Sequence, residues 1–135
     1  MTREEAIKTI RELVEKEAFL SKTDWENKRQ CGTDNHKKGL YFLYNKEKDC
    51  IYVGKVGDGL FTSFYHRMYG HGWGAHKRQP WYENVVYAKW HKFDLTGDKL
   101  ALIERLAIVG MGQPVYNDIC TDQNAIETLS ELKKS

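Results

Sequence analysis

Residues 39–71, GLYFLYNKEKDCIYVGKVGDGLFTSFYHRMYGH, decide how the chain folds. Two short runs of apolar and aromatic residues, Gly39–Tyr44 and Cys50–Gly54, flank the polar residues 45–49. Runs of this composition on either side of a polar turn predict a β-hairpin. The rest of the chain is therefore expected to pack around this hairpin.

Alternation of side chains along each strand predicts which residues share a face of the hairpin. On the first strand one face should carry Gly39, Tyr41 and Leu43, and the other Leu40, Phe42 and Tyr44. On the second strand Ile51 and Val53 should lie opposite Tyr52. A lone strand tyrosine is usually a core aromatic with its hydroxyl at the rim. Two tyrosines, each beside a glycine, favour a functional face instead.

The two tripeptides Gly39-Leu40-Tyr41 and Tyr52-Val53-Gly54, with ten residues between the tyrosines, resemble the signature of the GIY-YIG endonuclease superfamily. The resemblance extends over residues 39–117, which is more than half of the chain. It continues through an arginine, a histidine, a glutamate inside an apolar helix and an asparagine. The positions that match the functional set of the family are Tyr41, Tyr52, Arg67, His71, Glu104 and Asn117.

This resemblance implies a metal-dependent endonuclease that hydrolyses phosphodiester bonds, with DNA as the expected substrate and RNA not excluded. Glu104 is then the ligand of a single Mg²⁺ or Mn²⁺ ion, and Arg67 clamps a phosphate oxygen. Tyr41 is the candidate base for the attacking water, with Tyr52 holding the water or the phosphate. His71 could share the proton transfer, because an imidazole titrates near neutral pH. The sequence does not separate these two bases.

The segment that carries Glu104 predicts a helix over residues 99–109, which glycines at 110 and 112 end. The neighbours of Glu104 at three and four positions on either side are all apolar: Leu100, Ala101, Ala107 and Ile108. A carboxylate that emerges from such a face needs a partner. That partner is either a base such as Arg67 or Lys55, or the divalent cation that the resemblance implies. Asn117 is either a turn residue or, by resemblance, a residue that holds the geometry of the site.

Basic residues are concentrated around the hairpin although the net charge of the chain is only +2. Residues 37–92 hold ten Lys or Arg against four Asp or Glu, together with four of the five histidines and many aromatic residues. This composition is typical of a surface that contacts phosphates and bases. A solvated basic surface over an aromatic core is the alternative. The side chains that we expect to contact nucleic acid are Lys55, His76, Lys77 and Arg78.

The remaining segments predict helices around the hairpin and a third strand. Amphipathic helices are expected over residues 3–19, after a capping box, and over residues 60–69. Arg67 and His71 are four residues apart and would share a face on one helix. Residues 21–38 form a long connection with a helical turn near residues 23–29. Residues 70–76 form a glycine-rich loop, residues 82–93 contain the third strand with a polar face that could add phosphate contacts, and a last helix follows residue 121.

These elements predict the α+β class: a small three-stranded antiparallel sheet flanked by helices, similar to a GIY-YIG nuclease, with an extra helix at each end. The 135 residues should form a single domain with its core in residues 39–117, an N-terminal helix and connection in residues 1–38 and a C-terminal helix in residues 118–135. Without a separate DNA-reading domain, target choice would come from the site loops, the terminal helices, a homodimer or a partner protein.

Two other function classes remain open at this point. A catalytically inactive nucleic-acid-binding module on the same fold would show the same composition. A zinc-stabilised interaction domain would need ligands such as Cys31, His36, His71 and His76, whose spacing does not match the usual zinc-binding pairs. Free cysteines, the lack of a long apolar run and the lack of a signal-peptide pattern predict a cytoplasmic protein that does not enter a membrane.

Overall fold

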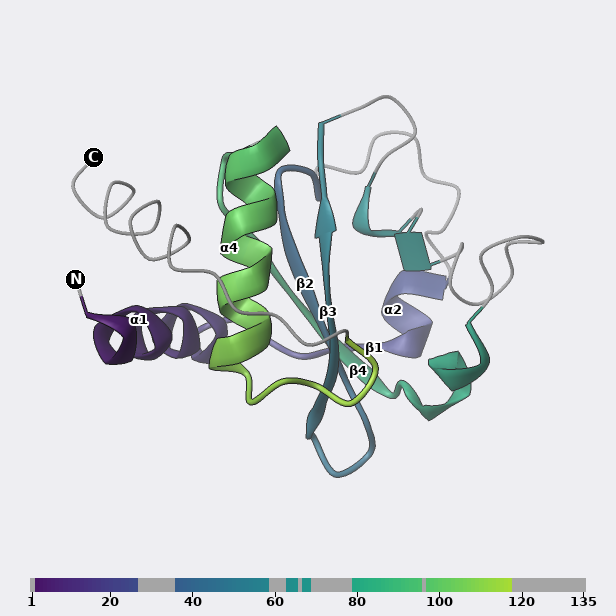
Figure 1. Ribbon diagram of the computed structural model, residues 1–135. Helices are drawn as coiled ribbons and strands as arrows, with labels where there is room; N and C mark the ends of the chain where they lie inside the picture. The colour runs from purple at the N-terminus through teal and green to yellow at the C-terminus, as the bar shows by residue number, and fades with distance from the viewer. Residues whose placement is uncertain are drawn as a thin grey trace.

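The sheet contains four antiparallel strands in the order β1-β4-β2-β3, as the computed structural model shows (Figure 1). The structure describes residues 2–26, 36–58, 63–65, 67–68, 79–95 and 97–117. The strands are β1 (Leu20–Ser21), β2 (Gly39–Tyr44), β3 (Cys50–Val56) and β4 (Tyr87–Lys92). The α+β class is confirmed. The sheet was expected to have three strands, and the strand that was not expected is β1. A strand of two residues is too short to show alternation in the sequence.

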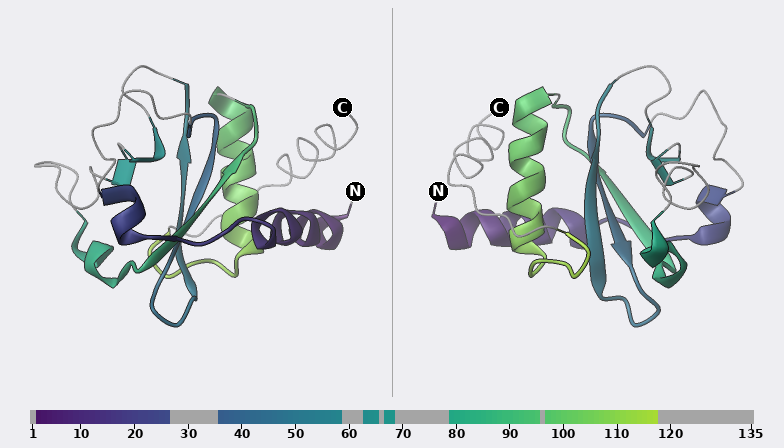
Figure 2. Two further views of the ribbon diagram at one scale, coloured as in Figure 1. Left: turned by 180° about the vertical axis from the view of Figure 1, so that it is seen from behind. Right: turned by 45° about the vertical axis from the view of Figure 1, so that its right-hand side comes forward.

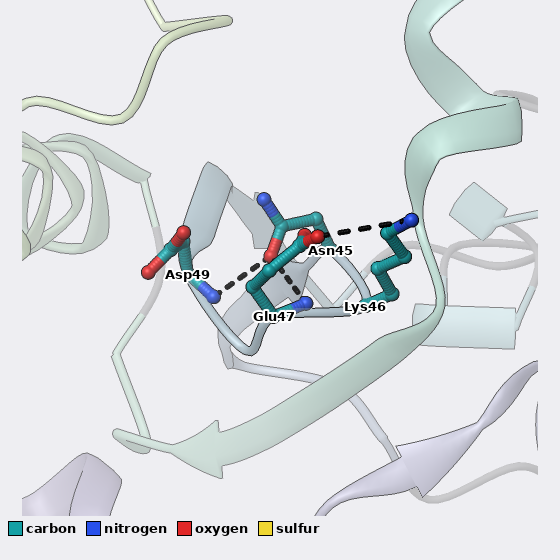
Figure 3. Close-up of polar contacts among 4 residues, drawn as sticks. All are labelled: Asn45, Lys46, Glu47 and Asp49. Atoms are coloured by element: carbon teal, nitrogen blue, oxygen red, sulfur yellow. Dashed lines mark hydrogen bonds and ion pairs between the residues drawn. The ribbon is translucent and has the colours of Figure 1, made fainter.

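Strands β2 and β3 form the predicted hairpin, and the side chain of Asn45 holds its turn (Figure 3). The Asn45 Oδ1 atom accepts hydrogen bonds from the backbone N–H groups of Glu47 at 3.1 Å and Asp49 at 2.9 Å. Lys48 has a φ of 65°, so it takes the left-handed conformation that closes such a turn. Short-range chemistry within the turn therefore sets how the two strands meet.

A β-bulge near the turn changes the faces that alternation predicts for β3. Leu43 pairs with Tyr52, whereas Tyr44 pairs with Cys50, so Ile51 has no partner on β2. Ile51 consequently packs in the same cluster as Leu43, with Tyr52 against it, and Val53 packs on the opposite face. The expectation that Ile51 and Val53 share a face is thus wrong, and the inserted residue is the physical reason.

Helices cover both faces of the sheet (Figure 2). One face carries α1 (Arg3–Glu15) and α4 (Gly97–Gly110), which pack on alternate side chains of β2 and on Val53. The other face carries α2 (Lys22–Glu26), a short 3-10 helix η1 (Pro80–Asn84) and the residues around Phe64. The hairpin therefore lies between two hydrophobic clusters, as the alternation of its apolar residues requires.

Helix α1 begins at the predicted cap, where the Thr2 hydroxyl accepts a hydrogen bond from the Glu5 N–H at 3.1 Å. The helix ends at Glu15 rather than at residue 19. Near this end the buried Lys89 Nζ donates to the Val14 carbonyl at 3.1 Å, and a cation at a helix C-terminus is favourable. Lys89 thus anchors α1 to β4. The polar face of this strand does not offer Lys89 to phosphates, in contrast to our expectation.

The third predicted strand begins later than residue 82. Pro80 starts the helix η1, for which its fixed φ is suited, and the Tyr82 hydroxyl accepts a buried hydrogen bond from Trp25 Nε1 at 3.0 Å. Strand β4 begins only at Tyr87 and pairs with both β1 and β2. None of the helices in the described ranges combines the length and the apolar character that a bilayer crossing requires.

Several predicted elements fall partly or wholly outside the described residues. Of the helix expected over residues 60–69, the described residues 64, 65, 67 and 68 are helical. The glycine-rich loop at residues 70–76 and the helix after residue 121 lie outside the described residues.

Candidate active site

The hairpin places the two tyrosines on the same face of the sheet. Tyr41 is opposite Gly54 and Leu43 is opposite Tyr52, so the tyrosines are diagonal neighbours. Their ring centroids are 6.1 Å apart, with an interplanar angle of 37°. The two tripeptides therefore bring their phenol rings next to each other.

Glycine is required at positions 39 and 54 of the two tripeptides, because other groups occupy the space of a side chain. A Cβ on Gly54 would overlap the ring carbons and the hydroxyl of Tyr41. A Cβ on Gly39 would overlap the carbonyl of His91 and lie 2.9 Å from the ring of Trp90 on β4. Since the far end of the Tyr41 ring lies over Gly54, its hydroxyl extends from β2 across β3 toward the edge of the sheet.

Helix α4, which carries Glu104, packs against β3 on the face of the sheet opposite the tyrosines (Figure 1). The side chain of Glu104 is neither buried nor fully exposed. Burial raises the pKa of the Glu104 carboxyl, while the positive charges of Lys55, Arg105 and Arg67 oppose this rise. The carboxylate therefore interacts electrostatically with Lys55 of the hairpin and with Arg67 of the segment after it.

Arg67 carries a polar atom without a partner. Its side chain is partly buried, and the Nε atom is fully buried with no hydrogen-bond partner among the described residues. Unpaired buried N–H groups are rare in folded proteins, because each loses its hydrogen bonds to water without replacement. A guanidinium in this state is suited to accept an anion such as a phosphate oxygen.

The hydroxyl of Tyr41 stays protonated at neutral pH in the free protein. Burial raises its pKa well above 10.0, and the neighbouring phenol of Tyr52, the Glu104 carboxylate and hydrogen bonding with the Tyr52 side chain act in the same direction. The positive charge of Arg67 opposes these effects without cancelling them. These shared electrostatic effects link Tyr41, Tyr52, Arg67 and Glu104. They also make the phenol a hydrogen-bond donor rather than a base in this state.

Asn117 is bound to the outer edge of β3. Its Oδ1 atom accepts from the Val53 N–H at 2.8 Å, and its Nδ2 atom donates to the Val53 carbonyl at 2.9 Å. The neighbouring Tyr116 N–H donates to the Ile51 carbonyl at 3.1 Å. Asn117 thus fixes the backbone between Tyr52 and Gly54.

An aromatic stack that sequence reasoning missed supports Tyr52. The Trp81 ring lies between the rings of Tyr52 and Tyr116, at centroid distances of 4.8 and 5.3 Å and interplanar angles of 29° and 12°. The Asn84 Nδ2 atom donates to the Tyr116 hydroxyl at 2.9 Å. These residues come from three separate segments, so no local spacing in the sequence could have indicated that they meet.

The remaining predicted site residues are distributed as follows. Lys55 is exposed on β3, where its charge acts on Glu104. His71, His76, Lys77 and Arg78 lie outside the described residues, as does Cys31. The proposed zinc ligand His36 packs against the rings of Tyr65 and Trp90.

The residues present are compatible with one hard cation. No group of three or more His, Cys, Asp or Glu that could hold a metal ion occurs within the described part of the chain. Mg²⁺ is commonly bound by one or two carboxylates, several waters and the phosphates of the substrate. Glu104, a single partly buried carboxylate on which the charge of Arg67 acts, fits this kind of site.

Comparisons with known proteins assign no family to the chain. No protein-family model matches it, no curated protein shows significant sequence similarity, and no solved structure matches it significantly.

Proposed function

We propose that the protein is a metal-dependent endonuclease of the GIY-YIG type, with its site at the edge of β3. The observation that carries this proposal is the electrostatic coupling of Tyr41, Tyr52, Arg67 and Glu104, together with a buried Arg67 Nε atom that has no hydrogen-bond partner among the described residues. A core built only for stability would pair that guanidinium with a carboxylate or a carbonyl. A site for a phosphodiester would instead use the guanidinium to donate to a phosphate oxygen.

In the proposed mechanism Arg67 donates to a non-bridging oxygen of the scissile phosphate. Tyr41, as a protonated phenol, donates a hydrogen bond to a phosphate oxygen, and Tyr52 orients the attacking water. Glu104 would hold a Mg²⁺ or Mn²⁺ ion, which supplies charge neutralisation at the phosphate and at the leaving oxygen. The raised pKa of Tyr41 leaves His71 as the candidate to accept the proton from water. The Lys55 side chain adds positive charge beside the carboxylate.

DNA is the proposed substrate. Basic and aromatic residues are concentrated in the sequence around the hairpin, and such side chains bind phosphates and bases. RNA carries the same phosphodiester chemistry and is the comparison substrate. Target choice in this proposal depends on a homodimer or on a separate DNA-targeting partner. A cytoplasmic location is part of the same proposal.

Cleavage of a supercoiled plasmid tests the proposal directly. We expect the purified protein to nick or cut DNA with Mg²⁺ or Mn²⁺ and to stop when EDTA removes the metal. Glu104→Ala and Arg67→Ala should each lower the rate at least about 100-fold, the typical cost of losing one group that stabilises the transition state. The exposed residues Glu12 and Arg3 on α1 offer controls with the same charges, and their alanine variants should cut like the wild type.

A nucleic-acid-binding module without cleavage is the second candidate. The Tyr41 hydroxyl, which burial keeps protonated, and Arg67 can both donate hydrogen bonds to a phosphate, and binding alone needs no group that accepts a proton from water. Binding in a gel-shift assay, with no product in any divalent metal on DNA or RNA, would establish this second function and reject the first.

A further inference from the structure

The outer backbone edge of β3 runs past the candidate active site. β3 is the last strand of the sheet, so the N–H and C=O groups of alternate residues point away from β2. Val53 is one of these residues, because both of its backbone groups bind the side chain of Asn117. Two positions further along, the same alternation turns the backbone groups of Lys55 outward.

The pairing of the two strands supports this orientation of Lys55. The register is regular from Gly39 opposite Val56 to Leu43 opposite Tyr52, and the bulge lies beyond that stretch. Lys55 is therefore in phase with Val53. Within the described part of the chain, no group hydrogen-bonds to the outward N–H of Lys55.

Among the described residues, hydrogen-bond partners cover the edge of β3 on one side of the site and none covers it at Lys55. Tyr116 and Asn117 occupy the outward groups of Ile51 and Val53, and this cover ends two residues before Lys55. At this position the two faces of the sheet contribute different groups. The Tyr41 hydroxyl lies over Gly54 on one face, and Glu104 acts on the Lys55 side chain from the other.

We propose that the backbone N–H of Lys55 is a phosphate donor, which binds a non-bridging oxygen of the same phosphodiester as Arg67. The assignment rests on the proposed nuclease function and extends it to a main-chain group that no side-chain motif reveals. A strand fixes the direction of its N–H groups, so such a donor needs no reorganisation when charge develops on the phosphate. The side chain and the backbone of Lys55 then have separate roles.

Two substitutions at residue 55 separate these roles. Lys55→Ala removes the charge and keeps the N–H, whereas Lys55→Pro removes both. Proline is accepted on an edge strand where the N–H faces outward, so both variants should melt at the same temperature. With a saturating supercoiled plasmid, we expect kcat of Lys55→Pro to be about 100-fold below that of Lys55→Ala, the usual cost of one lost backbone donor. Equal rates for two folded variants would overturn the assignment.

A second measurement decides the question even if the proline variant does not fold. The ¹⁵N–¹H spectrum of the metal-free wild type is recorded during titration with a short DNA duplex. We expect the Lys55 amide proton to move downfield with the same saturation as the Arg67 Nε–H signal. If the Arg67 signal moves and the Lys55 amide does not, the donor role is rejected.

The two experiments also separate this assignment from the nuclease proposal. If DNA shifts the Lys55 amide signal but the protein cuts nothing with any metal, the phosphate donor is supported and the nuclease proposal is rejected. If the protein cuts DNA and the two variants have equal rates, the nuclease proposal is supported and the donor is rejected. If no signal moves with DNA, both are rejected.

Discussion

The ring and hydroxyl of Tyr41 lie on Gly54 of the neighbouring strand and leave no room for a Cβ. Gly54→Ala should therefore displace the ring, with a loss of about 1–3 kcal/mol of unfolding free energy, as for other overpacked sites. Cleavage should fall by at least about 100-fold, because the phenol leaves its place beside Arg67. Urea denaturation and the plasmid assay measure the two effects.

Gly57 offers a matched control for this substitution. It follows β3 by one residue, and a Cβ at this position would meet no atom of the described residues within 4 Å. Gly57→Ala should change the free energy of unfolding by less than about 0.5 kcal/mol and leave cleavage unchanged. A Gly54→Ala variant as stable and as active as Gly57→Ala would show that the contact with Tyr41 is not required.

Burial of the Glu104 carboxyl predicts a pH-dependent change in stability. Its pKa is raised above 4.5 in the folded protein, so folding favours the protonated form, and the ionised form destabilises the native state. Glu104→Gln should unfold at a higher temperature than the wild type at pH 7. The difference should shrink as the pH falls through the folded pKa and vanish below about 4.

The same variant should lose cleavage, because an amide does not replace a carboxylate as the ligand of a hard cation. A gain in stability with a loss of activity is the usual mark of a residue retained for function. Glu12→Gln removes an exposed carboxylate from α1 and should change neither property. Equal melting temperatures of Glu104→Gln and the wild type at pH 7 would contradict the predicted cost of burial.

The hydrogen bonds of Asn117 predict a local effect on β3. Asn117→Ala removes one acceptor and one donor from the Val53 backbone, which should cost about 1–3 kcal/mol. The Val53 amide should also lose protection against hydrogen exchange, since its partner is gone. Val115→Ala, at a side chain that is 72% exposed, is the control and should alter neither property. Continued protection of the Val53 amide in Asn117→Ala would reject this role.

The stack of Trp81 predicts coupling with Tyr52. A double-mutant cycle with Trp81→Leu and Tyr52→Leu should give a coupling energy of about 0.5–1.5 kcal/mol, the range for aromatic pairs. In the plasmid assay, Trp81→Phe should retain more activity than Trp81→Leu, because a smaller aromatic ring still supports Tyr52. Additive effects within about 0.3 kcal/mol would show that the two rings do not support each other.

Local chemistry made the hairpin and the helices predictable from the sequence. The capping box at Thr2, the alternation in residues 39–44 and the apolar spacing around Glu104 each act over a few residues. Elements that depend on distant partners were missed or misplaced. Strand β1 exists because Leu20 pairs with Ala88, and η1 replaces the start of the expected strand where Tyr82 binds Trp25.

The candidate site was likewise predictable from the sequence only in part. The order of Tyr41, Tyr52, Arg67 and Glu104 along the chain indicated the candidate residues. It did not indicate the raised pKa of Tyr41 or the buried Arg67 Nε atom that has no hydrogen-bond partner among the described residues. Both properties arise from burial by segments far apart in the sequence. The bond between Asn117 and Val53 is likewise a product of tertiary structure, although the asparagine itself could be identified.

The contact between Val53 and Asn117 joins residues 64 positions apart, whereas the hairpin turn closes over five neighbouring residues. Local contacts form faster than distant ones during folding, so the tyrosine pair can assemble well before the outer border of its strand is sealed. A nascent chain still on the ribosome and lacking residue 117 would thus carry the paired tyrosines without the contact that fixes the outer edge of β3. In a nuclease, this order of assembly would delay activity until synthesis has passed the asparagine, and would protect nearby nucleic acid from unfinished copies of the enzyme.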